Sequence, residues 1–302
     1  MAITHLSSTD AGAPQVTKAL GDIAAVMKWA LPQLGWTLEF ESADSRIVAF
    51  KMDSGVFTGY IQFDHSSSVD VCYVKLYSSM TGINAGAGES GDAYWQCAYT
   101  GGDYPWEIRG DDASFLFIAY PYTTQQTSYG PNIMYAGLLN PISAVDNTFC
   151  AIGFISSGWT VNCWNGVVYN YMRTSFAGAK FLWDAANTSN NRDGGAINRH
   201  PFLDTTNRPL GGGGSFEVGG DSFVSPILFY DQNFVPRGHL RGVIGPWGDW
   251  KEQFAHEDTI TGVPMPSGIT KDLTFYRIRS QKYTPGSWGS ILLDTSTDWD
   301  WF

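Results

Sequence analysis

The sequence has few charged residues. Asp, Glu, Lys and Arg make up 16% of its 302 residues, whereas about a quarter is ordinary for a soluble domain. Acidic residues outnumber basic ones by 29 to 18, which gives a net charge of −11 at pH 7. There is no run of Lys or Arg, and binding to nucleic acid requires a basic patch. We therefore expect no nucleic-acid partner.

Long apolar runs are absent as well. No stretch approaches the ~20 apolar residues that a membrane-spanning helix needs, so we expect no membrane partner. The first residues, Met1–Leu6, lack the basic region and the apolar stretch of a secretory signal. We therefore expect the protein to be made and folded in a cytoplasm.

Cysteine and histidine are scarce. The cysteines form no CxxC pair, and they are Cys72, Cys97, Cys150 and Cys163. Such irregular spacing is typical of reduced, buried thiols, and a disulfide between Cys150 and Cys163 across adjacent strands is the alternative. The five histidines show no i, i+4 spacing, so the sequence predicts no metal site and no cofactor. The triplet His256-Glu257-Asp258 is typical of a solvated loop.

Aromatic residues and glycine are abundant, with 18 Phe, 15 Tyr, 12 Trp and 34 Gly. This combination indicates short strands and tight turns. Aromatic residues are also enriched at protein interfaces, whose cores are depleted of charge. The composition therefore favours a β-rich protein with surfaces that partners cover.

One N-terminal helix is predicted. Pro14 suits the first turn, where a missing N–H has no cost, and Gly35 suits a C-terminal stop. Between them, apolar residues recur at spacings of three and four and form one face. They are Val16, Leu20, Ile23, Met27, Leu31 and Leu34. We expect this amphipathic helix to pack on a sheet.

The rest of the chain is predicted to form strands. Each candidate is short and is bounded by Gly, Ser, Asp or Pro. They are Arg46–Met52, Phe57–Asp64, Val69–Tyr77, Tyr94–Tyr99, Ser114–Tyr120, Ile133–Leu138, Phe149–Ile155, Phe223–Tyr230, Gly238–Ile244 and Leu273–Arg279. The predicted fold class is mainly β, with antiparallel β-sandwich-like sheets and one N-terminal amphipathic helix.

The sharpest local prediction is a hairpin. The segments Trp159–Trp164 and Val167–Met172 flank Asn165-Gly166, the sequence that a two-residue type I′ turn prefers. Both faces of this hairpin are largely apolar, so we expect other parts of the protein to cover it on two sides.

The composition changes between residues 187 and 215. Polar residues follow Asn187, and the glycines of Gly211–Gly214 cannot pack a core. We predict an N-terminal helix plus β-rich domain over residues 1–186 and a Gly/Asn-rich loop or linker over 187–215. A C-terminal β segment over 216–302 completes either the same domain or a second one.

Paired acidic residues raise the question of a glycoside hydrolase, which needs two carboxylates about 5–9 Å apart. The pairs are Asp111 with Asp112 and Asp298 with Asp300. Asp111-Asp112 precedes the predicted strand at Ser114, where turn formation explains both residues. The sequence also has no Gly-x-Ser-x-Gly motif. We therefore predict that the protein is not an enzyme.

The chain ends in Asp298-Trp-Asp-Trp-Phe302, and two interpretations of this segment stay open. In the first, it is a final edge strand whose Trp299 and Trp301 face the core. In the second, it is a docking tail whose Trp and Phe side chains anchor an interface with a neighbouring subunit.

Several segments carry a resemblance. The first comprises Thr9–Pro14, the predicted helix and Gly35-Trp36, and the others are Val74–Gly86, Trp106–Phe117, Tyr135–Asp146 and Phe234–Ile244. In this order, they resemble segments of a family of tailed-bacteriophage virion proteins. The family's segments are a "TD-GAP" start with a helix and a glycine–tryptophan turn, an "MT-D-G" loop, a "W-I-D…FY" strand pair, an "FGDI-S…D" segment and an "RG-LRG" element. The chain departs from this pattern at Asn84 and at Leu138-Leu139, where the family has Asp and Asp-Ile.

The resemblance implies a structural component of a tailed bacteriophage particle on the tail, the baseplate or the neck/collar, and it supplies no catalytic residues. It implies a location in the virion, after synthesis in the host bacterial cytoplasm. Partners are then other copies of itself and other virion proteins, bound through aromatic-rich interfaces. The predicted interface residues are Trp159, Trp164, Arg237, Leu240, Arg241, Trp299, Trp301 and Phe302. The alternative is a carbohydrate- or receptor-binding module of the virion, with a host surface glycan as partner.

Overall fold

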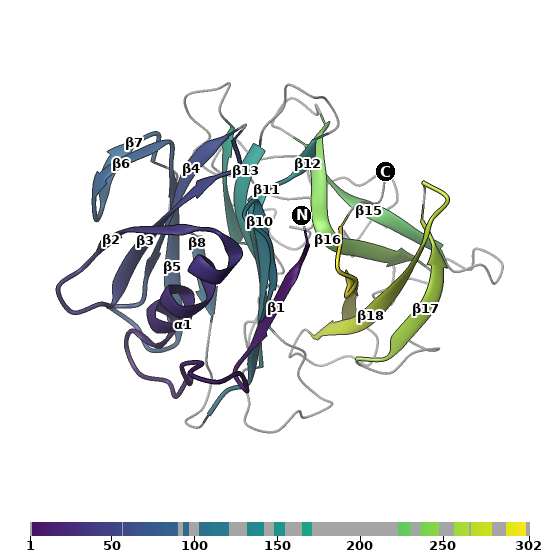
Figure 1. Ribbon diagram of the computed structural model, residues 1–302, viewed down its shortest axis with the longest axis horizontal. Helices are drawn as coiled ribbons and strands as arrows, with labels where there is room; N and C mark the ends of the chain where they lie inside the picture. The colour runs from purple at the N-terminus through teal and green to yellow at the C-terminus, as the bar shows by residue number, and fades with distance from the viewer. Residues whose placement is uncertain are drawn as a thin grey trace.

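The structure, a computed structural model, is mainly β and antiparallel, as predicted. It describes residues 2–55, 57–89, 93–96, 103–120, 132–141, 148–154, 165–170, 223–230, 236–247, 257–265, 267–279 and 288–299. Within these residues three sheets pack as layers, which run in Figure 1 from purple and blue through teal to green and yellow. We call them the N-terminal, central and C-terminal sheets.

The central sheet has six strands in the order β1-β9-β10-β11-β13-β14, and every neighbouring pair is antiparallel. The strands are β1 (Thr4–Ser7), β9 (Trp106–Gly110), β10 (Ser114–Ala119), β11 (Asn132–Leu138), β13 (Thr148–Phe154) and β14 (Asn165–Asn170). A turn of only three residues joins β9 to β10, so these two strands form a tight hairpin at one end of the sheet.

Both faces of the central sheet are buried at strand β10. Every residue of β10 is buried, and side chains along it alternate between two hydrophobic cores. Phe115 and Phe117 lie in the core shared with the N-terminal sheet, whereas Leu116 and Ile118 lie in the core shared with the C-terminal sheet. A continuous apolar run, rather than an apolar–polar alternation, is what a strand covered on two sides requires. The sandwich therefore has three layers.

The N-terminal sheet has the order β2-β3-β4-β5-β8. Its strands are β2 (Thr37–Glu41), β3 (Ile47–Asp53), β4 (Thr58–Asp64), β5 (Val71–Tyr77) and β8 (Ala93–Gln96). A small hairpin of β6 (Ser79–Gly82) and β7 (Ala85–Ala87) follows β5, and Met80 from it packs with Ala49 and Tyr77 in a separate cluster.

The N-terminal helix is shorter than predicted. Helix α1 spans Asp22–Ala30 and continues as the 3₁₀ helix η1, Leu31–Leu34. Its end at Gly35 is confirmed, because Gly35 adopts the left-handed conformation with φ 96°. The predicted start at Pro14 is wrong, since Val16 instead forms a β-bridge with Tyr104.

Local hydrogen bonds explain where α1 begins. Gly21 has φ 91°, which a helix interior does not allow. The Asp22 carboxylate accepts hydrogen bonds from the backbone N–H groups of Thr17 and Ala19, at 2.7 and 2.8 Å. This loop takes the place of the predicted first turns. The buried face of α1 then packs in the core between the N-terminal and central sheets, through Ile23, Ala24, Val26, Met27 and Ala30.

The C-terminal sheet has the order β12-β16-β19-β18-β17, with β15 also paired to β16. Its strands are β15 (Phe223–Tyr230), β16 (Pro236–Trp247), β17 (Thr259–Pro264), β18 (Thr270–Arg279) and β19 (Trp288–Asp294), together with β12 (Asn140–Pro141). Strand β12 belongs to the predicted N-terminal domain, so that domain supplies part of this sheet. The predicted linker over 187–215 lies outside the described residues.

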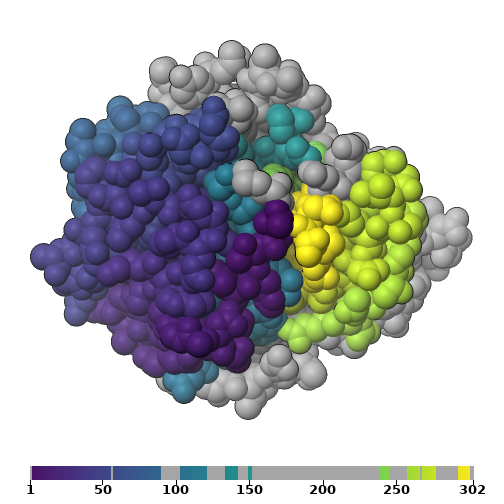
Figure 2. All heavy atoms as spheres, in the orientation of Figure 1, coloured from purple at the N-terminus to yellow at the C-terminus, as the bar shows by residue number. Residues whose placement is uncertain are grey.

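The two ends of the described chain meet. The Ile3 N–H donates to the Thr297 carbonyl at 2.8 Å, and Figure 2 shows the purple N-terminal segment beside the yellow C-terminal one. The first strand of the central sheet is therefore joined to the segment that follows the last strand of the C-terminal sheet.

The prediction of a hairpin turn at Asn165-Gly166 is wrong. Both residues lie in β14, where Asn165 pairs with Gly153 and Gly166 with Ile152 of β13. Pairing with β13 therefore overrides the local turn preference of Asn-Gly. The preceding predicted strand, Trp159–Trp164, lies outside the described residues.

The two cysteines that the structure describes, Cys72 and Cys150, are buried thiols outside any disulfide, as predicted. Cys150 therefore takes no part in the alternative disulfide. Burial raises the pKa of the Cys150 thiol well above its ordinary value, so it is a neutral group of the core.

Candidate functional site

The turn between β9 and β10 is built around Asp111. The Asp111 Oδ1 atom accepts hydrogen bonds from the backbone N–H groups of Ala113 and Ser114, both at 3.0 Å. A carboxylate that bonds the backbone two residues later is the usual device of an Asx turn. The interpretation of Asp111 as a turn residue is therefore confirmed.

Arg241 of β16 binds the same carboxylate from the C-terminal sheet. Its Nη1 donates to Asp111 Oδ1 at 2.9 Å and its Nη2 donates to Oδ2 at 2.7 Å, while Nη1 also donates to Ser114 Oγ at 2.9 Å. The side chains of Asp111 and Arg241 are 4% and 16% exposed. This is a largely buried, bidentate ion pair, the geometry that matches a guanidinium to a carboxylate best.

Trp36 ties the helical segment of the N-terminal layer to the same turn. Its indole Nε1 donates to the Asp111 carbonyl at 3.0 Å, and its side chain is 2% exposed. It also packs edge-on against Phe115 of β10, with ring centroids 5.3 Å apart. We call the group of Trp36, Asp111, Ser114 and Arg241, together with the adjacent Trp299, the Asp111 junction.

Trp299 packs against the side of Arg241. The guanidinium carbon lies 5.8 Å from the centre of the Trp299 ring, within cation–π range. The indole Nε1 donates to the Asp294 carbonyl at 3.1 Å, and the residue is 1% exposed. Gly242 allows this approach, because a Cβ atom there would lie 2.4 Å from Trp299 Cε2.

The junction changes the interpretation of several predicted interface residues. Trp299 faces the core of its own chain, as the first interpretation of the C-terminal segment has it, and Leu240 is 2% exposed in the same core. Arg241 is engaged with Asp111. These three residues therefore form an interface between layers within one chain. The side chain of Arg237 on β16 and all of Trp159, Trp164, Trp301 and Phe302 lie outside the described part.

Asp112 does not form a hydrolase pair with Asp111. Burial and the adjacent Asp111 carboxylate raise the pKa of Asp112 above its ordinary value. However, the Asp111 carboxylate is occupied by two backbone N–H groups and a guanidinium. A catalytic pair needs both carboxyl groups to face a substrate, and Asp111 has no such freedom.

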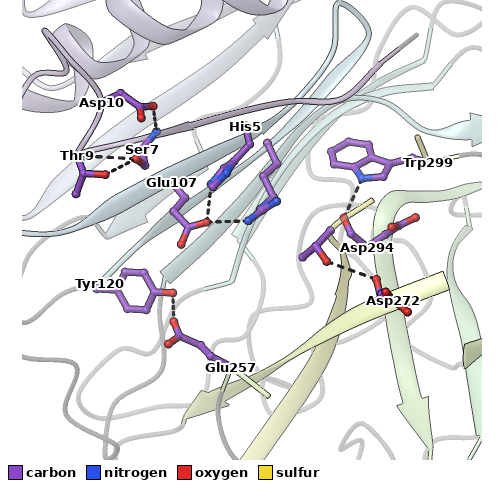
Figure 3. Close-up of polar contacts among 12 residues, drawn as sticks. His5, Ser7, Thr9, Asp10, Glu107, Tyr120, Glu257, Asp272, Asp294 and Trp299 are labelled. Carbon is purple, nitrogen blue, oxygen red and sulfur yellow. Dashed lines mark hydrogen bonds and ion pairs between the residues drawn. The ribbon is translucent and has the colours of Figure 1, made fainter. Parts of the chain in front are cut away.

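A second polar group lies further along the border between the central and C-terminal sheets (Figure 3). His5 of β1 contacts Glu107 of β9 with 2.9 Å between Nε2 and Oε2, and Arg109 Nη2 donates to the same oxygen at 3.3 Å. Burial opposes ionisation of Glu107. The hydrogen bond from His5 and the charge of Arg109 outweigh it, so the pKa of Glu107 lies below its ordinary value.

Two tyrosines continue this group. The Tyr120 hydroxyl donates to Glu257 (Figure 3), and Tyr276 of β18 lies beside Tyr120. Burial is the main reason that the pKa values of Tyr120 and Tyr276 lie far above the ordinary value. Both phenols therefore stay neutral hydrogen-bonding groups, and their burial leaves them no access to a substrate.

Lys271 holds the segment that leads to Trp299. Its ammonium group donates to Ser296 Oγ at 3.1 Å, to the Asp298 carbonyl at 3.0 Å and to the Asp298 carboxylate, and Asp294 Oδ2 lies 3.6 Å away. The Lys271 side chain is 7% exposed. A buried ammonium with this many oxygen partners is satisfied, so the lysine anchors the chain after β19.

Sequence reasoning missed Glu107, Tyr120, Tyr276 and Lys271 as members of polar clusters. For Glu107, the only signal is a charged residue inside a strand whose neighbouring residues are apolar. Glu107 and Arg109 alternate with the buried Trp106 and Ile108. Glu257 lies in a turn, in line with the loop predicted there, and its carboxylate accepts the Tyr120 hydroxyl across the border between the sheets.

Within the described ranges, no cluster of His, Cys, Asp and Glu side chains could hold a metal ion. No helix in the same ranges is long and apolar enough to cross a membrane. No protein-family model, no curated protein and no solved structure matches the chain.

The Asp111–Arg241 pair makes a prediction about stability. The change Arg241→Met should lower the free energy of unfolding by about 3–5 kcal/mol, because the Asp111 carboxylate stays buried without its cation. The matched control is Lys28→Met, which breaks the more exposed ion pair of Lys28 with Glu41 and should cost less than about 1 kcal/mol. Urea unfolding measures both, and equal losses would contradict the assigned role.

Gly242 makes a second prediction, with Gly262 as its control. Both glycines have left-handed backbones, with φ 71° and 67°, so alanine costs about 1 kcal/mol of backbone strain at either position. Only Gly242 faces Trp299, whereas nothing lies within 4 Å of a Cβ at Gly262. Gly242→Ala should therefore lose about 1–3 kcal/mol more than Gly262→Ala. Thermal unfolding of the two variants checks the difference, and its absence would show that Trp299 is not packed there.

Proposed function

We propose that this protein is a structural component of a tailed bacteriophage particle, located on the tail, the baseplate or the neck/collar. It assembles with copies of itself and with other virion proteins, and it performs no catalysis. The observation that carries the proposal is where the segments resembling the virion family lie in the fold.

Four of these segments meet at the turn around Asp111. The first contributes Trp36, which donates to the Asp111 carbonyl, and the last contributes Arg241, which binds the Asp111 carboxylate. The third contains the turn itself. The fourth contributes Leu138, whose N–H donates to the Ala113 carbonyl at 2.9 Å. Trp36 and Arg241 join other layers to this turn, whereas Leu138 binds it from the neighbouring strand β11 of the same sheet.

The first segment makes a further contact of the same kind. The Trp106 indole Nε1 donates to the Pro14 carbonyl at 2.9 Å, which fixes the loop before α1 on strand β9. An active site needs polar groups aimed at a substrate. The segments that carry the resemblance instead supply hydrogen bonds and packing within and between layers. This supports a role in which a stable shape, rather than a reaction, is what the particle needs.

The alternative, a carbohydrate- or receptor-binding module, needs aromatic faces open to solvent. None of the tryptophan side chains described is exposed: Trp36, Trp106 and Trp299 are buried, and Trp29 is half-buried and packs edge-on against Trp106. The described tryptophans therefore offer no stacking platform for a sugar. A host surface glycan remains a candidate partner that a glycan-binding assay on the isolated protein tests.

The location in the particle is tested by mass spectrometry of purified virions. The protein should be present in a small fixed copy number, because closed rings contain a defined number of subunits. Phages without the gene should yield particles with a tail or neck defect. The proposal would be contradicted if such phages yielded normal particles and the purified protein stayed monomeric.

The two interpretations of the C-terminus now make separable predictions. Trp299→Ala should unfold the chain at a lower temperature and lose about 3–5 kcal/mol, because it removes a buried aromatic side chain. Deletion of Trp301 and Phe302 should leave the unfolding temperature unchanged and reduce self-association, measured by light scattering after size-exclusion chromatography. Unchanged self-association of the shortened chain would rule out the docking tail.

A further inference from the structure

His65 lies where the N-terminal sheet meets the beginning of helix α1. It follows Asp64, the last residue of β4, and it is 1% exposed. Its ring Nδ1 accepts hydrogen bonds from the backbone N–H groups of Gly21 at 3.0 Å and Ile23 at 3.4 Å. The first N–H groups of a helix have no partner within the helix. A side chain from the sheet therefore caps α1.

This geometry fixes the protonation state of the ring. A nitrogen that accepts two hydrogen bonds carries no proton, and the hydrogen bond to the Val69 backbone uses the ring's other nitrogen as donor. The ring is therefore neutral, with its proton on Nε2. Burial lowers the pKa of His65 below its ordinary value, although the Val69 carbonyl and nearby carboxylates act in the opposite direction.

Charged groups face the ring from each element around it. Asp22 lies on α1, Asp64 on β4 and Asp70 before β5, and all three attract a proton to the ring. Lys18, in the loop before α1, pairs with Asp70 at 2.9 Å. The backbone N–H of His65 donates to the Arg46 carbonyl at 3.0 Å. The Arg46 side chain lies near the helix start, since its Cγ would be 3.2 Å from a Cβ atom at Gly21.

We propose that His65 is a pH-sensitive latch that holds helix α1 on the N-terminal sheet only while its ring is neutral. A proton on Nδ1 removes both hydrogen bonds that the ring accepts and places a positive charge at the positive end of the helix. The Gly21 N–H keeps the His65 carbonyl as an acceptor at 3.1 Å, whereas the Ile23 N–H loses the ring as its acceptor. The carboxylates of Asp22, Asp64 and Asp70 offset only part of the cost of this buried charge. The attachment of the helix to the sheet then weakens from Ile23 onward, and the packing of Ile23 and Val26 in the core loosens.

The direction of the pH dependence follows from the neutral docked state. The docked helix binds one proton fewer than the released one, so docking is fully stable above the ordinary histidine pKa of about 6.5. Docking weakens as the pH falls from that value towards the lowered pKa of His65, by at most about tenfold per pH unit, since one proton is involved. The latch is independent of the proposed virion function.

Hydrogen exchange of the full-length protein tests the latch. Amide protection in α1, corrected for the intrinsic pH dependence of exchange, is measured between about pH 8 and 5, where histidine changes charge. In the wild type it should fall by up to about tenfold per pH unit at the acidic end. In His65→Asn it should stay level, because the Asn Oδ1 can accept the same hydrogen bonds and does not titrate. His5→Asn, which changes a more exposed histidine, should keep the wild-type response.

Three results would overturn the proposal. They are level protection of α1 in the wild type, the same fall in His65→Asn, and loss of the response in His5→Asn. Nitrogen-15 NMR of the wild-type histidine rings gives a test that does not depend on folding of a variant. It should show a neutral His65 ring with its proton on Nε2, and a proton on Nδ1 at about pH 8 would refute the latch.

Discussion

The buried ion pair between Asp111 and Arg241 is the interaction on which the arrangement of the layers depends. Removing one partner would leave an uncompensated charge among apolar side chains, which is far more costly than the pair itself. The Asp111 carboxylate has all its hydrogen-bond partners only when the β9–β10 turn has formed and β16 lies beside it. The C-terminal sheet therefore has one favourable register against the central sheet, and other registers leave a charge buried without a partner.

The position of both chain ends follows from this constraint. With Arg241 fixed, the adjacent Gly242 presents a flat surface on which the Trp299 ring packs, and Arg241 covers the same ring. Lys271 holds the segment that leads to Trp299, and Ile3 binds that segment from the start of the central sheet. Loss of the Asp111–Arg241 ion pair should therefore loosen the packing of Ile3 and Trp299, which are remote from Asp111 in sequence.

The sequence predicts the strands whose patterns are strong and misses what depends on distant partners. The apolar run Ser114–Ala119 and the alternating Leu273–Arg279 are observed as strands, and both have a residue pattern that predicts a strand without knowledge of distant partners. Short strands with little apolar pattern, such as Thr4–Ser7, were missed. Val16 fits the spacing of the helix but pairs with Tyr104, and Asn165-Gly166 has a turn sequence but pairs with β13. In each case a tertiary contact outweighs a local preference.

The same physics explains why the predicted interface residues Leu240, Arg241 and Trp299 join layers of one chain. Aromatic and arginine side chains stabilise any closely packed contact between surfaces, within a chain or between chains. A central sheet covered on both faces also needs more apolar residues than a two-layer sandwich, so it accounts for part of the low charge. The low charge and the high aromatic content are therefore weaker arguments for assembly once the three-layer fold is known. The proposed virion role rests instead on the four resembling segments that meet at the turn around Asp111.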